Sequence, residues 1–190
     1  TENLLADAEL CVLISEILEK CGLDEKDYTV KISTRKLTDD LFKNLKILSR
    51  EQILTSQRAL DKIDRLGWEE VKKLLGKGRK DKSGDYTKGA NLNNDQIKEI
   101  ESALKGKNPD MEDIKEILSI FEAYDFKNYK YDPSIIRGLE YYTGPIFEVD
   151  LNFEVKNSKG KAIQFGSIGG GGRYDNLVSN FGNLDCPATG

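Results

Sequence analysis

Hydrophobic positions along the first 48 residues follow a helical period and then a strand period. Apolar side chains recur every three or four residues over residues 4–21, and Gly22 follows them, which predicts an amphipathic helix that ends there. Residues 28–33, YTVKIS, alternate apolar and polar side chains and predict a half-buried strand. We expect a short helix to follow from about Thr38.

Residues 50–125 have the pattern of helices and loops, with no convincing strand. Ser49 and Gln52 are spaced like a capping box ahead of a first helix. Asn94 and Asp110 are expected to cap two later helices. The helical period between two β-containing segments predicts a separate helical unit with its own small core. The members of that core are expected to include Leu60, Ile63, Ile114, Ile117 and Phe121.

The pattern returns to β after Pro133. In FEVDLNFEVK, residues 147–156, odd positions are apolar and even positions polar, which predicts a strand with one face toward a core and the other toward water or a ligand. NSKG predicts a hairpin turn, KAIQFGSI a returning strand, and GGGGRYDNLV the end of that strand and the start of a helix. The order favours an α+β domain interrupted by a helical insertion. The expected parts are residues 1–48, 49–132 and 133–190.

Composition and charge exclude several classes of protein but do not indicate which reaction or ligand is involved. The 190 residues carry a net charge of −4, so bulk charge gives no reason to invoke nucleic acid. Three scattered cysteines and no histidine disfavour a zinc site and suit a reducing cytoplasm. No apolar run reaches the roughly 18–20 residues of a membrane span. The first residues, TENLLADAEL, lack an initiator Met and suggest a piece of a longer chain.

Two segments hold the residues most suited to binding a ligand. RGLEYYTGPIFE, residues 137–148, places an arginine and two tyrosines just before the long strand, and by residue type alone a surface arginine with tyrosines packed at a sheet edge is the commoner arrangement. GSIGGGGRYDNLV, residues 166–178, has four consecutive glycines. A glycine within a strand costs about 0.5–1 kcal/mol relative to alanine, so the run marks either a close approach to the backbone or a flexible turn. Neither a phosphate loop nor a dinucleotide fingerprint fits its spacing.

Together the two segments resemble the histidyl-tRNA synthetases. RGLEYYTG resembles that family's signature R-G-L-D-Y-Y-T-G, with Glu140 in place of the usual Asp, and IGGGGRYDNLV resembles its strand G-G-G-R-Y-D-x-L. LADAELCVLI with YTVKISTRKL resembles the helix and strand after motif 2, QRALDKIDRLG with GRKDKSGDYTKGA the insertion of some bacterial members, and PATG the approach to motif 3. The resemblance implies a class II antiparallel-sheet catalytic domain, residues 1–48 and 133–190, around a helical insertion domain.

The resemblance also implies roles for individual residues. The family activates histidine with ATP to histidyl-adenylate and transfers it to tRNA(His). Arg137 matches the arginine that meets the carboxylate and phosphate, a task suited to an always-charged guanidinium. The residues matching the histidine pocket are Tyr141, Tyr142, Gly170, Gly171 and Gly172. Supporting roles fall to Arg173, Tyr174 and Asp175, with Arg173 a weaker ligand candidate.

Several parts of the family's machinery are not in this sequence. Motif 1, which builds the homodimer interface, and the ATP-binding arginines of motifs 2 and 3 are missing, so we expect the isolated chain to bind histidine weakly and not to charge tRNA. ATP is expected as a substrate with Mg²⁺, without protein metal ligands in this chain. The insertion of this family approaches tRNA, and its basic loop here carries Lys77, Arg79, Lys80, Lys82 and Lys88. A solvated loop is the commoner explanation of such a run.

Three rival interpretations remain open. A non-catalytic paralogue, such as a regulatory subunit of histidine biosynthesis, keeps the fold but tends to lose the arginine-tyrosine signature, which is intact here. A tRNA-sensing domain fused to a stress kinase would show a kinase signature in the same gene. An inactive binding fragment is compatible with synthetase ancestry.

Overall fold

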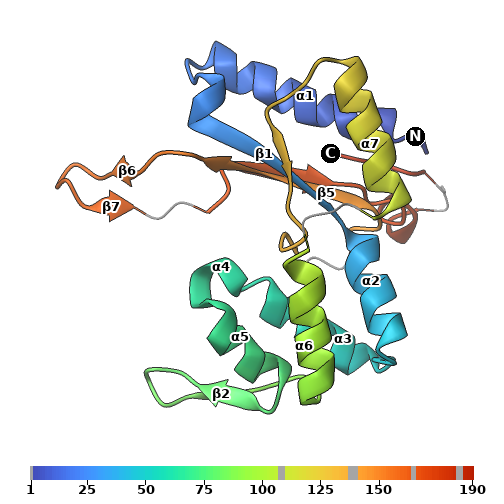
Figure 1. The fold of residues 1–190 in the computed structure, drawn as a ribbon, viewed down its shortest axis with the longest axis vertical. Helices are drawn as coiled ribbons and strands as arrows, with labels where there is room; N and C mark the ends of the chain where they lie inside the picture. Colours follow the sequence, from blue (N-terminus) through green and yellow to red (C-terminus); the bar gives the residue numbers. More distant parts are fainter. Residues whose placement is uncertain (1, 107–109, 137–140, 164–165, 183–185) are drawn as a thin grey trace.

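The chain is built around a four-stranded sheet whose order is β4-β1-β5-β8 (Figure 1). The computed structural model describes residues 2–106, 110–136, 141–163, 166–182 and 186–190. The strands of the sheet are β1 (Tyr28–Thr34), β4 (Tyr129–Tyr131), β5 (Pro145–Leu151) and β8 (Gly169–Gly172). β5 is antiparallel to both β1 and β8, and β4 is parallel to β1. Among the described residues no helix has the length and apolar character to cross a bilayer.

Two helices cover one face of this sheet. α1 (Leu5–Lys20) and α7 (Glu112–Ala123) bury their apolar sides against Val30 and Ile32 of β1 and their partners on β5, Val149 and Phe147. Because neighbouring residues of a strand face opposite ways, the polar residues between them lie on the opposite, open face. We call this assembly the sheet unit; its fully buried side chains include Tyr28, Ile114, Ile117 and Phe121.

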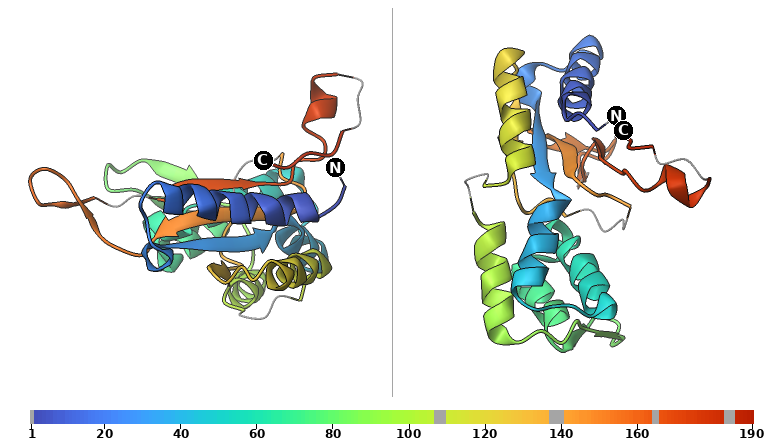
Figure 2. Two further views of the ribbon diagram at one scale, coloured as in Figure 1. Left: turned by 90° about the horizontal axis from the view of Figure 1, so that it is seen from above. Right: turned by 90° about the vertical axis from the view of Figure 1, so that its right-hand side faces the viewer.

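A second core lies at one end of the sheet, and α2 (Arg35–Asn44) runs between the two cores (Figures 1 and 2). The other elements of this helical unit are α3 (Arg50–Leu60), α4 (Ile63–Leu66), α5 (Trp68–Leu75), α6 (Asn94–Leu104) and the hairpin of β2 (Gly78–Lys80) with β3 (Tyr86–Lys88). Its core contains Phe42, Leu60, Leu75 and Ile100, and Ile63 packs against it. Ile136 is the one buried member of this core that follows α6 among the described residues.

The prediction that α7 belongs to the helical core is wrong. Ile114, Ile117 and Phe121 pack on the sheet, and β4, which follows α7, pairs with β1. The amphipathic period of α7 revealed that one face is buried but carried no information on what buries it. The expected absence of strands from this block is also wrong, because β2 and β3 form a short hairpin between α5 and α6. We propose that the insertion consists of α3 to α6, within the predicted range 49–132.

The long strand predicted for residues 147–156 ends early. β5 stops at Leu151, because Asn152 turns the chain aside: its backbone N–H donates to the carbonyl of Asp27 at 2.8 Å and its side-chain amide to that of Lys26 at 3.0 Å. Phe153 is therefore 47% exposed. β6 (Val155–Lys156) and β7 (Ala162–Ile163) form a separate hairpin around the predicted NSKG turn, which is confirmed.

Several predicted element ends are also wrong. α2 begins at Arg35 rather than near Thr38, because Thr34 acts as its N-cap. Ser49 makes no capping hydrogen bond, and Gln52 donates instead to the carbonyl of Ala90 at 3.1 Å. The caps of α6 and α7 are Asn93 and Met111, not Asn94 and Asp110. The helix expected after the glycine run is only a 3₁₀ turn, η2 (Val178–Asn180).

Candidate functional site

The two segments singled out in the sequence meet at one end of the open face of the sheet. Tyr142 packs with Ile135 and Ile146, and its ring lies beside Gly172 of β8. Arg137 and residues 138–140 lie outside the described residues, so the predicted convergence of Arg137 with the glycine strand stays a prediction. What the structure does bring together is the tyrosine pair and the glycine strand.

Three tyrosine rings form an aromatic wall at this end of the sheet. The ring centroids of Tyr141 and Tyr142 are 4.6 Å apart, and the ring of Tyr174 lies 6.0 Å from the first and 6.5 Å from the second. Tyr142 is 7% exposed and is chiefly part of the packing, whereas Tyr141 and Tyr174 are half-buried. Residues 141–144 lie in a turn and loop, not in a strand, which is how two adjacent tyrosines come to share one wall.

The glycine strand is close-packed against the protein itself. A Cβ on Gly171 would lie 2.1 Å from the carbonyl oxygen of Gly190 and 2.7 Å from the ring of Phe147. One on Gly172 would lie 2.6 Å from the carbonyl oxygen of Pro145 and 2.9 Å from Tyr142. Neighbouring chain therefore accounts for these two glycines without a ligand. Gly170, opposite Glu148 in the sheet, is exposed.

A polar row crosses the open face next to Gly170. Lys31 of β1 lies opposite Glu148 of β5, and its Nζ is 2.7 Å from a carboxylate oxygen of Asp150 and 3.5 Å from one of Asp132. Burial alone would lower the pKa of Lys31, but the hydrogen bond and charge of Asp150, with the charge of Asp132, raise it overall. The lysine therefore stays charged and holds Asp150 in place.

A cavity of about 400 Å³ opens beside this row, and Asp64 of α4 also lines it. Its other acidic lining residues are Glu148, Asp150 and Glu154. The excess of carboxylates suits a ligand that carries a positive charge. The sequence alone did not reveal Glu148 and Asp150 as site residues, although the even positions of the strand were expected to be polar and to face water or a ligand.

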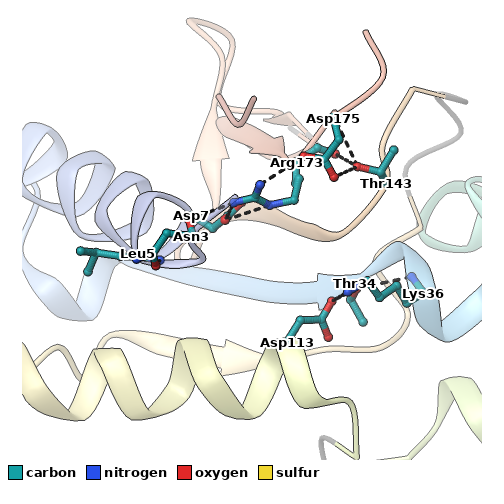
Figure 3. A network of polar contacts seen from close by, with 9 residues as sticks. All are labelled: Asn3, Leu5, Asp7, Thr34, Lys36, Asp113, Thr143, Arg173 and Asp175. Carbon is teal, nitrogen blue, oxygen red and sulfur yellow. Dashed lines mark hydrogen bonds and ion pairs between the residues drawn. The ribbon is translucent and has the colours of Figure 1, made fainter. Parts of the chain in front are cut away.

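Arg173 is held by carboxylates on the helix-covered side of the sheet (Figure 3). It is 5% exposed, and its guanidinium makes a close pair with the buried Asp7 of α1, to which Nε donates at 3.1 Å. Nη1 donates to Asp175 at 3.1 Å, and Asp175 accepts a hydrogen bond of 2.8 Å from the hydroxyl of Thr143. The described contacts thus give Arg173 and Asp175 a supporting geometry, while Tyr174 joins the aromatic wall.

A similar link lies at the same end of the strands, farther across the sheet beside α7, and is also shown in Figure 3. The hydroxyl of Thr34 donates to the buried carboxylate of Asp113 at 2.7 Å, and Lys36 Nζ lies 3.4 Å from the same oxygen. This link joins the end of β1 to the start of α7.

The basic loop proves to be the β2–β3 hairpin, and only some of its cations are held in ion pairs. Arg79 pairs with Glu70 at 3.0 Å and Lys88 with Glu51 at 3.0 Å. Of the five cations of this loop, three are exposed and have no ion pair among the described residues: Lys77, Lys80 and Lys82. Asp81 closes the turn by accepting from the backbone of Ser83 and Asp85. Within the described part of the chain no group of carboxylates or cysteines has the arrangement of a metal site.

Comparisons with known proteins agree with one another. The family model for histidyl-tRNA synthetase matches residues 1–190. The chain is 41% identical to the histidine–tRNA ligase of Bartonella quintana (strain Toulouse), over 100% of the chain and 43% of that protein, and 42% identical to that of Rhizobium meliloti (strain 1021), over 97% and 42%. The chain thus spans less than half the length of these relatives.

Solved structures share the fold over the whole chain. A histidyl-tRNA synthetase from Nostoc sp. PCC 7120 matches with a TM-score of 0.76 at 23% identity and is covered over 44% of its length. A protein from Bacillus halodurans C, described as an ATP phosphoribosyltransferase regulatory subunit/histidyl-tRNA synthetase, matches with a TM-score of 0.66 at 20% identity and is covered over 47%. At these identities the likeness concerns the fold alone.

Proposed function

The chain belongs to the histidyl-tRNA synthetase family, and on that premise we propose that it supplies the histidine-binding part of a histidine–tRNA ligase. The observation that carries the proposal is the meeting of the tyrosine pair with the glycine strand, two segments that lie far apart in the sequence and pack against each other. The complete reaction, with ATP and tRNA(His), is proposed for a protein that also carries motifs 1, 2 and 3.

The open face suits a small amino acid with one positive and one negative end. Glu148 and Asp150 lie beside the exposed Gly170 and favour the ammonium end. Tyr141 is half-buried, and a phenol hydroxyl can donate to or accept from a neutral imidazole. A site built on such hydrogen bonds rejects side chains that lack the matching groups. Arg137 is assigned to the carboxylate end by its place in the RGLEYYTG signature.

In the proposed reaction a carboxylate oxygen of histidine attacks the α-phosphorus of ATP. The new oxygen–phosphorus bond forms as the bond to the leaving pyrophosphate breaks, and negative charge spreads over the phosphate oxygens. A fixed cation aimed at that charge lowers the barrier, which is the role we give to Arg137. Mg²⁺ bound to ATP would screen the charge of its phosphates.

For tRNA we propose a contact with the β2–β3 hairpin. Lys77, Lys80 and Lys82 are exposed there, and phosphate groups bind such cations with little regard to sequence. For the complete protein we propose a homodimer in the cytoplasm. The exposed thiols of Cys21 and Cys186 suit a reducing compartment.

The test is histidine-dependent exchange of pyrophosphate into ATP by the full gene product. We expect Arg137→Ala to lower the exchange rate by about 10²–10³-fold, as does the loss of one oxyanion donor. Arg79→Ala is the matched control, because Arg79 is paired with Glu70 in the helical unit and should leave the rate unchanged. Undiminished exchange in Arg137→Ala would refute the role given to this arginine. The 190-residue chain alone should show no exchange.

A regulatory function is the second candidate. The fold is compatible with it, since the Bacillus halodurans protein, whose description includes a phosphoribosyltransferase regulatory subunit, shares that fold. Histidine binding by the full gene product without any pyrophosphate exchange would support this function over the ligase.

A further inference from the structure

The tyrosine wall lies on a segment that has no regular secondary structure of its own. Residues 141–144 precede β5, and the wall is therefore only as rigid as the contacts that hold this segment. Several of those contacts come from one residue. The backbone N–H of Thr143 donates to the carbonyl of Arg173 at 2.8 Å, and the N–H of Arg173 donates to that of Pro145 at 2.8 Å.

The side chain of Arg173 fastens the same segment to α1. Its guanidinium pairs with Asp7, donates to the carbonyl of Asn3 at 3.1 Å, and donates to Asp175, which in turn accepts from the Thr143 hydroxyl. The backbone N–H of Asp175 donates back to that hydroxyl at 3.1 Å. The aliphatic stem of Arg173 lies against Gly144, where an added Cβ would come within 3.1 Å of Cδ. Residues 143–145 are therefore bound to Arg173, and its side chain links them to the first turn of α1 (Figure 3). The N–H of Arg35 donates to the carbonyl of Gly144 at 2.8 Å and holds the segment to the end of β1 as well.

We propose that Arg173 is a positioning residue for the histidine site, which acts on the tyrosine wall through Thr143 and Asp175. The identity of the ligand, histidine, rests on the proposed function, whereas the positioning of the tyrosine wall by Arg173 does not. A guanidinium suits this place because it stays charged and its fork reaches two carboxylates and a carbonyl at once. A lysine keeps the charge, but its three donors share one nitrogen and cannot take the separate positions of Nε, Nη1 and Nη2. Asp7 and Asp175, which the sequence alone did not single out together, complete the device.

The Thr34–Asp113 link provides a matched control within the same chain. It is also a threonine hydroxyl donating to an aspartate, with almost the same length, 2.7 Å against 2.8 Å. It joins β1 to the covering helix α7, whereas the Thr143–Asp175 bond joins the loop before β5 to the residues that follow β8. The backbone of β1 does adjoin the segment that carries the aromatic wall, because Thr34 pairs with Pro145 and the N–H of Arg35 donates to the carbonyl of Gly144 at 2.8 Å, but the side-chain bond of Thr34 goes to α7.

Each hydroxyl also accepts from one backbone N–H, that of Asp175 for Thr143 and that of Lys36, at the start of α2, for Thr34. Thr143→Val and Thr34→Val therefore each remove a bond to an aspartate and a bond from the backbone, and only those of Thr143 belong to the proposed device.

The test measures stability, tyrosine order and substrate kinetics for Thr143→Val, Thr34→Val and Arg173→Lys in the full gene product. We expect Thr143→Val to raise the KM for histidine by roughly tenfold, the equivalent of one hydrogen bond to a charged group, with the KM for ATP unchanged. Arg173→Lys should reproduce this effect, and Thr34→Val should lower the melting temperature to a similar degree without changing the KM for histidine. Equal changes in KM from the two threonine variants would overturn the proposal.

A second readout does not depend on histidine. In ¹H NMR spectra of the protein, the ring signals of Tyr141 and Tyr142 should broaden or shift toward random-coil values in Thr143→Val and stay in place in Thr34→Val. If the wild-type protein fails to bind histidine but the ring signals respond as expected, the proposed function fails and the positioning role stands. Unchanged ring signals in both Thr143→Val and Arg173→Lys would refute the positioning role.

Discussion

The sheet unit is held together by residues far apart in the sequence, and the helical unit by residues close together in it. In the sheet unit, Arg173 pairs with a residue 166 positions away, and Thr34 bonds to one 79 positions away. The helical unit is folded almost wholly from residues 42–104 of the chain. Because the candidate site lies on the sheet, it depends on long-range pairing of the whole chain. The helical unit adds a local core beside it.

Two intrinsic probes make this contrast measurable. The single tryptophan, Trp68, packs against the helical core, and all three cysteines lie outside the helical unit. Cys11 of α1 is buried, and burial, aided by the charge of Asp7, raises the pKa of its thiol. Trp68 fluorescence therefore reports the helical unit, and the rate of Cys11 alkylation reports the sheet unit. In the 190-residue chain, replacing the exposed Cys21 and Cys186 by serine leaves Cys11 as the one thiol that can be alkylated.

The largest expected effect comes from removing one large side chain from each core. Leu75→Ala should cost about 2–5 kcal/mol and Phe121→Ala about 3–5 kcal/mol, because both side chains are fully buried. We expect Leu75→Ala to shift the Trp68 transition while Cys11 stays protected, and Phe121→Ala to speed the alkylation of Cys11. If Leu75→Ala exposes Cys11 equally, the two units unfold together and the distinction between them fails.

The next effect tests the crowded edge of the sheet unit. Gly171→Ala should destabilise the protein by about 1–3 kcal/mol, because its Cβ would collide with the backbone of Gly190 and with Phe147. Gly182→Ala is the control, since nothing in the described part of the chain lies within 4 Å of its Cβ position. Urea unfolding followed by circular dichroism measures both variants. A Gly171→Ala protein as stable as the control would mean that residues 188–190 do not pack beside β8.

These cores also show which parts of the structure the sequence could predict. The class II α+β fold and the family were predicted correctly from RGLEYYTG and the glycine run, since the matching motifs extend along the chain. α1 and β1 were predicted from period alone, because each buries one regular face. The partner of α7 could not be predicted, since its apolar stripe suits a sheet as well as a helical core. The end of β5 depends on side-chain bonds of Asn152 that no pattern announces.

The candidate site shows the same limit. The tyrosine pair and the glycine strand were marked by motifs, and their contact is observed. Asp7 could not be found from the sequence, because it lies in an ordinary first helical turn and becomes special only where Arg173 reaches it. The acidic row at Glu148 and Asp150 was hidden by the regular alternation of a strand, in which every exposed position is polar. These two carboxylates become candidate binding groups only because they line a cavity beside the strand.

A smaller effect separates the two units by pH. The pKa of Glu101 on α6 is lowered to about 2, chiefly by a hydrogen bond from Lys105. A hydrogen bond from the neighbouring Lys72 contributes to the same shift. The stabilisation is therefore complete above the ordinary glutamate pKa of 4.5 and is lost as the pH falls toward 2. Lys72 also lies 6.0 Å from the centroid of the Trp68 ring, so Trp68 emission should titrate in this range. Glu101→Gln should abolish the titration, whereas a persistent change would place the acid-sensitive group elsewhere.

The smallest effect on stability is expected at the β2–β3 hairpin, where the change should instead appear in RNA binding. Lys80→Ala and Lys88→Ala should each alter the free energy of unfolding by less than about 1 kcal/mol, because exposed charges and exposed ion pairs contribute little.

Each phosphate-binding cation that is removed should reduce the slope of log affinity against log salt concentration by about 0.7–0.9. We expect this reduction for Lys80→Ala, whose side chain has no ion pair among the described residues, and a smaller one for Lys88→Ala, because Lys88 already pairs with Glu51. Filter binding of tRNA(His) to the full gene product at several salt concentrations measures both slopes. Identical slopes for wild type and Lys80→Ala would show that the hairpin is a solvated loop, and the helical unit would then have no demonstrated part in recognition.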